Sequence, residues 1–196
     1  MKKALIGAGG FAREIKAHVG DDIVKCFVDD KYWIENSECI HLLSTFNPAE
    51  YEVLVAIADP TDRHDMVQRL PKETKYFTFI HPTAQILGSD VSIGEGSIIC
   101  AGCILTTNVK VGRHVHLNLL TTIGHDCEIG DYFTTAPGVK ISGNCTIYDC
   151  VYIGTNASVK EKISIHSSTT IGLNSGVVKH IEESGVYVGT PAKKIK

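Results

Sequence analysis

The sequence predicts a small α/β unit followed by a long parallel β-helix. Two observations support this prediction: strand-like and helix-like segments alternate near the N-terminus, and aliphatic residues recur at every sixth position from Leu87 onward. A chain of 196 residues is long enough for two such units. We therefore expect one domain over residues 1–81 and a second over residues 82–196.

The first domain is predicted from short apolar strands that alternate with helical segments. This order is typical of βαβ units, which build a parallel sheet. Gly20 ends the first expected helix, and Pro60 precedes the second. The expected elements are strands at 3–6, 23–28, 53–58 and 76–80, helices at 12–19 and 61–70, and an irregular stretch at 32–47.

A glycine-rich turn follows the first strand and suggests a nucleotide ligand. Residues 7–12 match the dinucleotide-binding pattern G-x-G-x-x-A, in which Gly9 and Gly10 let the backbone approach a phosphate. Asp29 and Asp30 follow the second strand, where a carboxylate normally binds ribose hydroxyls. Because only about 80 residues precede the repeat, we expect a half-Rossmann unit holding a nucleotide-linked ligand, rather than a nicotinamide-dependent enzyme. A purely structural glycine turn is the alternative.

The second domain is predicted from a repeat with a period of six. Neither a helix nor an ordinary strand has this period. A coil with three flat faces explains it: each face contributes one inward aliphatic residue, a small or apolar residue follows four positions later, and glycine favours the tight corners. The inward positions step by six without an insertion from Leu87 to Val177, and only Thr135 is not aliphatic. Sixteen hexapeptides at three per turn give about five turns.

Composition and charge narrow the expected partners. Lysine and arginine total 19 against 22 aspartates and glutamates, so the net charge is −3 and no nucleic-acid partner is expected. No run approaches the roughly 18 apolar residues of a membrane span, so no membrane partner is expected either. Seven cysteines without paired spacing or an export signal indicate reduced thiols and a cytoplasmic protein. Because Cys100-x-x-Cys103 lacks a second ligand pair, we expect no metal site.

One corner of the predicted coil carries a candidate general base. His125 is the third residue of the hexapeptide 123–128 and lies outside the aliphatic core, so packing does not explain it. Imidazole titrates near neutral pH and can accept a proton from an attacking amine, and Asp126 stands next to it. Cys127 occupies an inward position, with Cys145 one turn later, so we interpret both thiols as core residues rather than nucleophiles.

Six segments of the chain match a known family. They are GAGGFARE at 7–14, VDD at 28–30, IHPTA at 80–84, Asn118, GHDC at 124–127 and GTPAKK at 189–194. Through these segments the whole chain resembles the bacterial sugar acetyltransferases that include sialic acid O-acetyltransferases and the bacillosamine-pathway and perosamine N-acetyltransferases. The resemblance implies a left-handed β-helix and acetyl transfer from acetyl-CoA to a nucleotide-activated deoxysugar. It also implies a homotrimer that binds acetyl-CoA between adjacent helices.

The resemblance also assigns roles to individual residues. It implies His125 as the catalytic base and Asp126, in place of the family's usual Glu, as the carboxylate that orients the imidazole. Phe11 and Thr134 stand where relatives often carry histidine. The expected substrate-binding residues are Gly9, Gly10, Phe11, Asp29, Asp30, Ala58 and Asn118, and the expected acetyl-CoA-binding residues are Thr134, Gly154, Thr155, Gly172 and Leu173.

Together these observations predict an acetyl-CoA-dependent sugar N-acetyltransferase in which the acceptor amine attacks the thioester directly, with His125 as general base. Two alternatives stay open: acetylation of a sugar hydroxyl, as on sialic acid, and a β-helix that binds a ligand without catalysis. The residues do not decide between an amine and a hydroxyl, because both need the same base and the same acetyl-CoA site.

Overall fold

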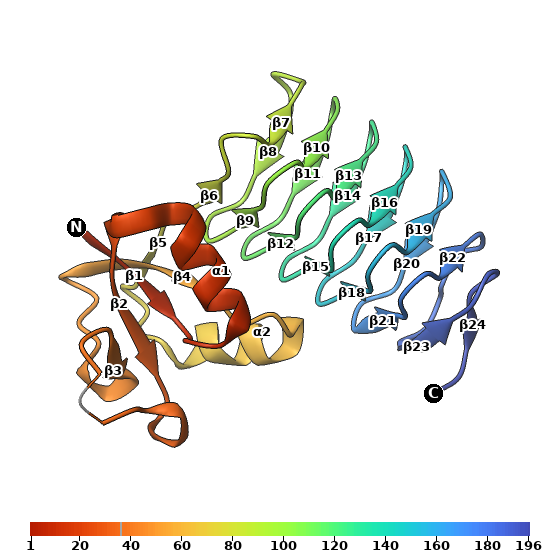
Figure 1. The fold of residues 1–196 in the computed structure, drawn as a ribbon. Helices are drawn as coiled ribbons and strands as arrows, with labels where there is room; N and C mark the ends of the chain where they lie inside the picture. Colours follow the sequence, from red (N-terminus) through yellow and green to blue (C-terminus); the bar gives the residue numbers. More distant parts are fainter. Residues whose placement is uncertain (36) are drawn as a thin grey trace. The chain divides into compact units, whose positions relative to one another are not determined.

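The computed structural model describes residues 1–35 and 37–196, which form two compact units, 1–79 and 80–196 (Figure 1). The first unit contains a parallel sheet with two α-helices, and the second is a stack of coils built from very short strands. Both α-helices have ten residues, so among the described residues no helix is long enough to cross a membrane.

The first unit is a five-stranded parallel sheet in the order β3-β2-β1-β4-β5. Its strands are β1 (Lys2–Ile6), β2 (Ile23–Val28), β3 (Ile40–Leu42), β4 (Tyr51–Val55) and β5 (Lys75–Tyr76). Its helices are α1 (Gly10–Val19) and α2 (Pro60–Arg69), with 3-10 helices at Gly20–Asp22, Asp30–Tyr32 and Leu43–Thr45. The strand order reverses at β1, because β2 and β4 lie on its two sides. The carboxyl ends of β1 and β4 therefore border the crevice where open parallel sheets bind ligands.

The two central strands are covered on both faces. Leu5 of β1 and Leu54 of β4 have no exposed surface, as expected of apolar runs in a parallel sheet. The segment that follows β4 ends in a helix cap: Asp59 Oδ1 accepts hydrogen bonds from the backbone N–H groups of Thr61 and Asp62, at 2.9 and 3.0 Å. This cap fixes where α2 begins and hence the course of the preceding loop.

The structure corrects several predicted boundaries in this unit. α1 begins at Gly10, two residues earlier than predicted, so the glycine turn itself opens the helix. β4 ends at Val55, because residues 56–58 leave the sheet and line a pocket. β3 pairs with β2 inside the stretch that was expected to be irregular. The strand predicted at 76–80 is divided, since β5 pairs with β4 whereas β6 (Phe79–Ile80) belongs to a sheet of the coils.

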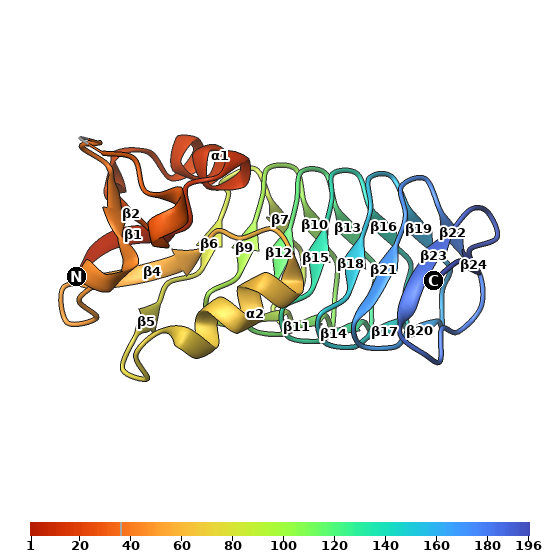
Figure 2. The same cartoon turned by 90° about the horizontal axis from the view of Figure 1, so that it is seen from below.

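The second unit is a left-handed parallel β-helix with three flat faces (Figure 2). One face carries β7 (Gln85–Ile86), β10 (Ile104–Leu105), β13 (Thr122–Ile123), β16 (Lys140–Ile141), β19 (Ser158–Val159) and β22 (Gly176–Val177). The next carries β8 (Ser92–Ile93), β11 (Lys110–Val111), β14 (Glu128–Ile129), β17 (Thr146–Ile147) and β20 (Ser164–Ile165). The third carries β6, β9 (Ile98–Ile99), β12 (His116–Leu117), β15 (Thr134–Thr135), β18 (Tyr152–Ile153), β21 (Thr169–Ile171), β23 (Gly185–Val188) and β24 (Lys193–Lys194).

Three-residue corners join the faces and stack into edges. The first edge, between the eight-stranded and six-stranded faces, contains 100–102, 118–120, 136–138, 154–156 and 172–174. The second edge, between the six-stranded and five-stranded faces, contains 88–90, 106–108, 124–126, 142–144, 160–162 and 178–180. Most corners end in a residue with left-handed backbone, such as Asp126 with φ 58°. Asn and Asp adopt this conformation more easily than other residues with a side chain, and several corners use them.

The core of the coils follows the predicted period, with one exception at its start. Leu117 and Thr121, an aliphatic residue and the small residue four positions later, both have no exposed surface. Leu87, by contrast, is 63% exposed, and Ile86 packs against the core in its place. Ile86 pairs with Leu105, 19 residues later, whereas the partners in the following coils, as far as Val159 with Val177, are 18 residues apart. The first coil therefore holds one extra residue, and the prediction of an uninterrupted register is wrong there.

Candidate active site

The candidate catalytic pair lies on the second edge, directly after β13. His125 Nδ1 is 2.7 Å from Asp126 Oδ2. The other carboxylate oxygen, Oδ1, accepts a hydrogen bond of 2.7 Å from Asn108 Nδ2 in the preceding coil. These two hydrogen bonds, first that from Asn108 and then that from His125, lower the pKa of the Asp126 carboxyl. The carboxylate is thus held negative beside the imidazole.

The ring of His125 is available to a ligand. Its side chain is 57% exposed, as expected for a corner residue outside the core. When Nδ1–H donates a hydrogen bond to the carboxylate, Nε2 carries the lone pair and can accept a proton from a substrate. The arrangement is that of a histidine base oriented by an acid.

The thiol next to this pair belongs to the core. Cys127 has no exposed surface, and the backbone N–H of Cys145 donates to its Sγ at 3.4 Å. The hydrogen bond with the Cys145 thiol and burial both raise the pKa of Cys127. Both side chains are buried, which confirms the predicted packing role of these two thiols. The raised pKa also keeps Cys127 protonated, and a buried, protonated thiol is a poor nucleophile.

The residues expected to bind acetyl-CoA lie along the first edge and beside it. Gly154 and Gly172 occupy equivalent corner positions, and a Cβ on Gly154 would lie 2.7 Å from the backbone nitrogen of Leu173. Leu173 is 69% exposed. Thr155 belongs to the same edge, and Thr134 lies in β15 on the face that leads to it. These residues therefore line one edge, while His125 and Asp126 stand on the next.

Asn118 also lies on the first edge rather than beside His125. Its Oδ1 accepts a hydrogen bond of 2.7 Å from the backbone N–H of Leu119. Its own backbone N–H donates to Thr135 Oγ1 at 2.9 Å. Within one chain the six-stranded face separates Asn118 from His125, so the structure does not bring these two predicted site residues together.

A cavity of about 770 Å³ lies in the first unit, at the carboxyl ends of β1, β2 and β4. Its lining includes Gly9, Gly10, Phe11, Asp29 and Ala58, all predicted from the sequence. A Cβ on Gly9 would have no neighbour within 4 Å, and one on Gly10 would meet only the Arg13 guanidinium, at 3.9 Å. Asp30, the other predicted residue, begins a 3-10 helix and is not among the residues that line this cavity.

Arg69 is a pocket residue that the sequence analysis missed. It ends α2, and its guanidinium donates to both carboxylate oxygens of Asp29, at 2.6 and 3.0 Å. This bidentate hydrogen bond lowers the pKa of Asp29. A second arginine of α2, Arg63, is fully buried and donates to the carbonyl oxygens of Ile57 and Ala58. Arg69 thus keeps the Asp29 carboxylate ionised in the pocket, and Arg63 holds the backbone that forms the pocket wall.

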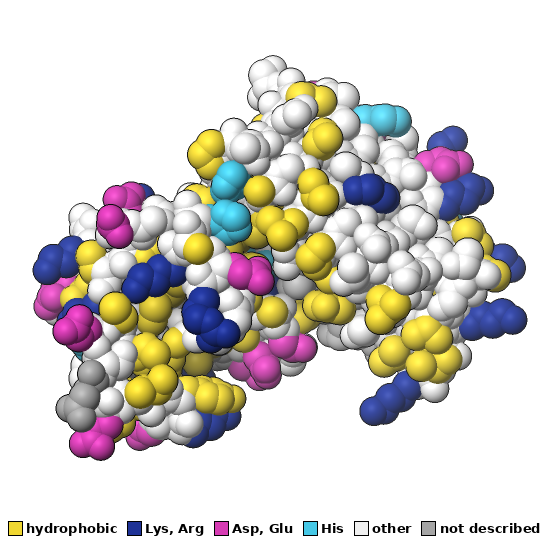
Figure 3. Space-filling view, viewed as in Figure 1, with side chains coloured by type: hydrophobic (Ala, Val, Ile, Leu, Met, Phe, Trp, Pro, Cys, Tyr) yellow, Lys and Arg dark blue, Asp and Glu magenta, His cyan; other side chains and the backbone are white. Residues whose placement is uncertain are grey.

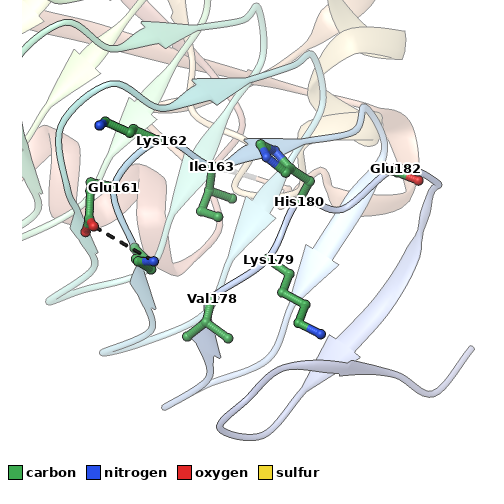
Figure 4. A pocket seen from close by; sticks show the side chains of 8 residues that line it. Glu161, Lys162, Ile163, Val178, Lys179, His180 and Glu182 are labelled. Atoms are coloured by element: carbon green, nitrogen blue, oxygen red, sulfur yellow. Dashed lines mark ion pairs between the residues drawn. The ribbon is translucent and has the colours of Figure 1, made fainter.

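A second cavity, of about 570 Å³, lies on the second edge near its C-terminal end (Figure 4). Its lining has three lysines (Lys160, Lys162 and Lys179) and His180 against two carboxylates, Glu161 and Glu182, and Glu161 forms an ion pair of 3.9 Å with Lys160. Dark-blue side chains are also prominent on the C-terminal coils in Figure 3, and because the sequence has no arginine after Arg113, they are lysines there. Sequence reasoning missed this cluster, although the three lysines occupy corner positions that the period identifies. A basic pocket on the same edge as His125 suits an anionic ligand.

The chain is similar to several characterised proteins. A family model described as the PglD N-terminal domain matches residues 2–70. Over 173 residues the chain is 34% identical to the GDP-perosamine N-acetyltransferase of Escherichia coli O157:H7, covering 81% of this chain and 78% of that protein. The acetyltransferase domain of PglB from Neisseria gonorrhoeae FA1090, in complex with acetyl coenzyme A, matches with a TM-score of 0.85 and 26% identity over 99% of both chains. PerB from Caulobacter crescentus, in complex with CoA and GDP-perosamine, shares the fold with a TM-score of 0.88 and 22% identity, over 100% of this chain and 98% of that one.

Proposed function

Because the chain belongs to the bacterial nucleotide-sugar acetyltransferases with a left-handed β-helix, and is an acetyl-CoA-dependent sugar N-acetyltransferase, we propose that it acetylates the amino group of a nucleotide-linked amino-deoxysugar with His125 as general base. The observation that carries the proposal is the His125–Asp126 pair, held at 2.7 Å on an exposed corner. A GDP-linked amino sugar is the first acceptor to test, since the 34% identical relative is a GDP-perosamine N-acetyltransferase.

In the proposed mechanism, His125 removes the proton that the amine loses as it attacks. Nδ1–H donates to Asp126 Oδ2, which fixes the tautomer in which Nε2 accepts that proton. The negative charge of Asp126 then stabilises the imidazolium. Acetyl-CoA would supply the acetyl group as a thioester: the C–N bond forms, the C–S bond breaks, and the CoA thiolate leaves and takes up the proton from the imidazolium to give the free thiol. Direct attack is favoured over an acyl-enzyme because Cys127, the nearest thiol in sequence, is buried and has a raised pKa.

We propose that residues 1–81 bind the nucleotide sugar. The open space at Gly9 and Gly10 lets backbone N–H groups at the start of α1 approach a diphosphate. Phe11, Asp29 and Ala58 line the same cavity and supply contacts for the rest of the ligand. Asp30 remains a proposed contact from the rim, in the 3-10 helix that follows β2.

We propose that residues 82–196 bind acetyl-CoA along the coil edges. Lys160, Lys162 and Lys179 fit the phosphates of this co-substrate, because they line one basic cavity. The first-edge residues expected to bind acetyl-CoA (Thr134, Gly154, Thr155, Gly172 and Leu173) lie across a face from His125, as does Asn118. A site that uses both edges is completed when the first edge of one chain meets the second edge of another. This geometry supports the proposed homotrimer. Because acetyl-CoA and nucleotide sugars are cytoplasmic metabolites, we also propose that the reaction is cytoplasmic.

The experiment is a panel of GDP-, UDP-, dTDP- and CMP-linked amino sugars, with acetyl-CoA and continuous detection of the released thiol. One amino sugar should turn over, and its product should be an amide that resists mild alkali. The matched sugar with a hydroxyl in place of the amine is the control. Turnover of the hydroxyl sugar alone, giving an alkali-labile ester, would instead support O-acetylation. Absence of thiol release with every sugar would overturn the proposal.

A further inference from the structure

The imidazole of His125 has close neighbours in the coils before and after its own. Residues 18 positions apart stack along an edge, so the same corner position is occupied by Thr107 in the preceding coil and by Gly143 in the following one. A Cβ on Gly143 would lie 2.7 Å from both Cε1 and Nε2 of the ring, and 3.0 Å from Cδ2. Real Cβ atoms almost never come so close to another heavy atom, so any side chain at 143 must displace the ring.

The backbone does not explain why residue 143 is glycine. Gly143 is not among the glycines with positive φ. The equivalent corner positions of other coils carry side chains, namely Ser89, Thr107, His125, Glu161 and Lys179. The coil therefore tolerates a Cβ at this position. What differs at Gly143 is that the half of the ring that carries Nε2 lies directly against it.

The preceding coil contributes a side chain that holds the acid. Asn108 Nδ2 donates to Asp126 Oδ1 at 2.7 Å, while the opposite oxygen, Oδ2, engages His125. Asn108 is itself fixed, because its left-handed backbone (φ 50°) ends a corner and its neighbour Thr107 bonds to Asp90 through its hydroxyl, at 3.1 and 3.2 Å. The carboxylate thus has one oxygen for each neighbour and little freedom to rotate.

We propose that Asn108 and Gly143 are positioning residues for the acetyl transfer. Asn108 holds the Asp126 carboxylate in the orientation that fixes the Nδ1–H tautomer of His125. Gly143 leaves the space that the Nε2 half of the ring needs to stand at the acceptor. Three successive coils therefore each supply one part of the base: the amide that anchors the acid, the acid with the imidazole, and the missing side chain. This inference rests on the proposed role of His125.

The role of Asn108 is tested by Asn108→Ala against the matched control Asn144→Ala. Asn144 lies at the equivalent position of the coil after Asp126 and has the same left-handed backbone (φ 58°), so both substitutions carry the same conformational cost. We expect Asn108→Ala to lower kcat about 10-fold, since it removes a hydrogen bond to a charged group, with both KM values unchanged. Asn144→Ala should keep kcat within about twofold. Equal kcat in the two variants would overturn the role of Asn108.

The role of Gly143 is tested by a double-mutant cycle with His125. Gly143→Ala should lower the Tm and kcat of the native protein, but should leave the Tm of the His125→Ala variant almost unchanged, because the clashing ring is gone. The same fall in Tm in both backgrounds would mean that the coil itself requires glycine, and would overturn the proposal.

Ring nitrogen chemical shifts from NMR supply a readout that a merely structural role would not move. The native protein should populate the Nδ1–H tautomer of His125, and Asn108→Ala should mix the two tautomers. An unchanged tautomer in Asn108→Ala would count against the proposal. If His125→Ala itself retains native kcat, the proposed base is wrong. If His125→Ala is inactive while Asn108→Ala and Gly143→Ala are fully active, only the positioning inference fails.

Discussion

The β-helix and the α/β unit bring their functional residues together in different ways. In the β-helix, Asn108 and Asp126 are neighbours because they are 18 residues apart in a coil that repeats every 18. In the α/β unit, Asp29 meets Arg69, 40 residues later, because the end of β2 and the end of α2 both reach the same pocket. The first arrangement follows from local repetition, and the second from the topology of a whole sheet. Truncation of an exposed side chain on an edge should therefore change chemistry with little effect on folding, whereas substitutions at the pocket rim should change binding and stability together.

The largest expected effect comes from the edge. His125→Ala should lower kcat about 10²-fold or more, because a positioned general base contributes that much, and Asp126→Ala should lower it less. The Tm should change little, since the His125 side chain is 57% exposed. Thiol release under saturating substrates measures kcat, and Cys127→Ala is the control that should retain it. Native kcat in His125→Ala, or an acetylated Cys127 trapped without acceptor, would contradict the mechanism.

A smaller effect is expected at the glycine turn of the α/β unit. Gly10→Val should raise the KM for the nucleotide sugar about 10-fold, because the side chain fills space that a phosphate would use and blocks charge-assisted hydrogen bonds from the backbone. The KM for acetyl-CoA should stay unchanged. Initial rates with one substrate varied at a time separate the two constants.

The companion variant for this pocket is Asp30→Ala. Asp30 does not line the cavity, so its effect on the nucleotide-sugar KM reports whether the rim contacts the ligand. If Gly10→Val leaves both KM values unchanged, the glycine turn is structural and the nucleotide binds elsewhere.

A few-fold effect is expected from the basic cavity on the second edge. The double variant Lys160→Ala/Lys179→Ala should raise the KM for acetyl-CoA about fivefold, since each exposed charge contact contributes at most about 1 kcal/mol. The increase should be smaller with acetyl-dephospho-CoA, which lacks the 3′-phosphate. Lys110→Ala is the matched control, because Lys110 lies on a flat face and pairs with Glu128 at 2.9 Å. An equal rise in KM for Lys110→Ala would point to net charge rather than to a phosphate site.

The smallest effect concerns the Asp29–Arg69 pair and pH. The pKa of Asp29 is lowered in the folded protein, chiefly by the hydrogen bond from Arg69, so the pair stabilises the fold above the unfolded value of about 3.9. That contribution is lost as the pH falls through the lowered pKa. Arg69→Ala should therefore reduce stability by about 1 kcal/mol or less at pH 7, and by still less at a pH below 3.

Thermal unfolding of the native protein and Arg69→Ala at both pH values measures this difference. Lys72→Ala, which removes another exposed cation near the end of the same helix, is the control and should show no such pH dependence. A Tm difference that is the same at both pH values would show that Arg69 acts by packing rather than through its charge.

The sequence predicted the coils well because their structure repeats every six residues, so a residue's place in a coil follows from its position along the chain. Counting in sixes identified the inward residues, the corner that holds His125 and the stacking of Cys127 with Cys145. It failed at Leu87, since Ile86 and Leu87 are both aliphatic and a one-residue insertion between repeats leaves no mark in the composition. Residues 18 positions apart stack, so the spacing also predicts a contact between Asn108 and Asp126. No chemical signal, however, distinguished Asn108 from the other asparagines at corners.

The pocket of the α/β unit was predicted only in part. Its glycine turn and Asp29 were recognisable, because their positions relative to one strand and one helix are local. Arg69 was not, since its place beside Asp29 depends on how α2 lies against a sheet whose strand order the sequence does not state. The predicted strand ran past the end of β4 for a related reason. Residues 56–58 continue the apolar run, but they form the pocket wall, where Arg63 donates to the carbonyl oxygens of Ile57 and Ala58.

The 19-residue first coil has a practical consequence for protein engineering. Its extra residue lies between Ile86 and Ile93, before the coils that carry Asn108, His125 and Gly143, and strand partners from Ser92 to Val177 stay 18 residues apart. Length can therefore change next to Leu87, which is 63% exposed, without shifting the register of the following coils. A tag inserted there should leave Asn108 stacked with Asp126 and His125 stacked with Gly143. A single residue inserted between 109 and 142 would move side chains of the later coils by one position and separate those stacked residues.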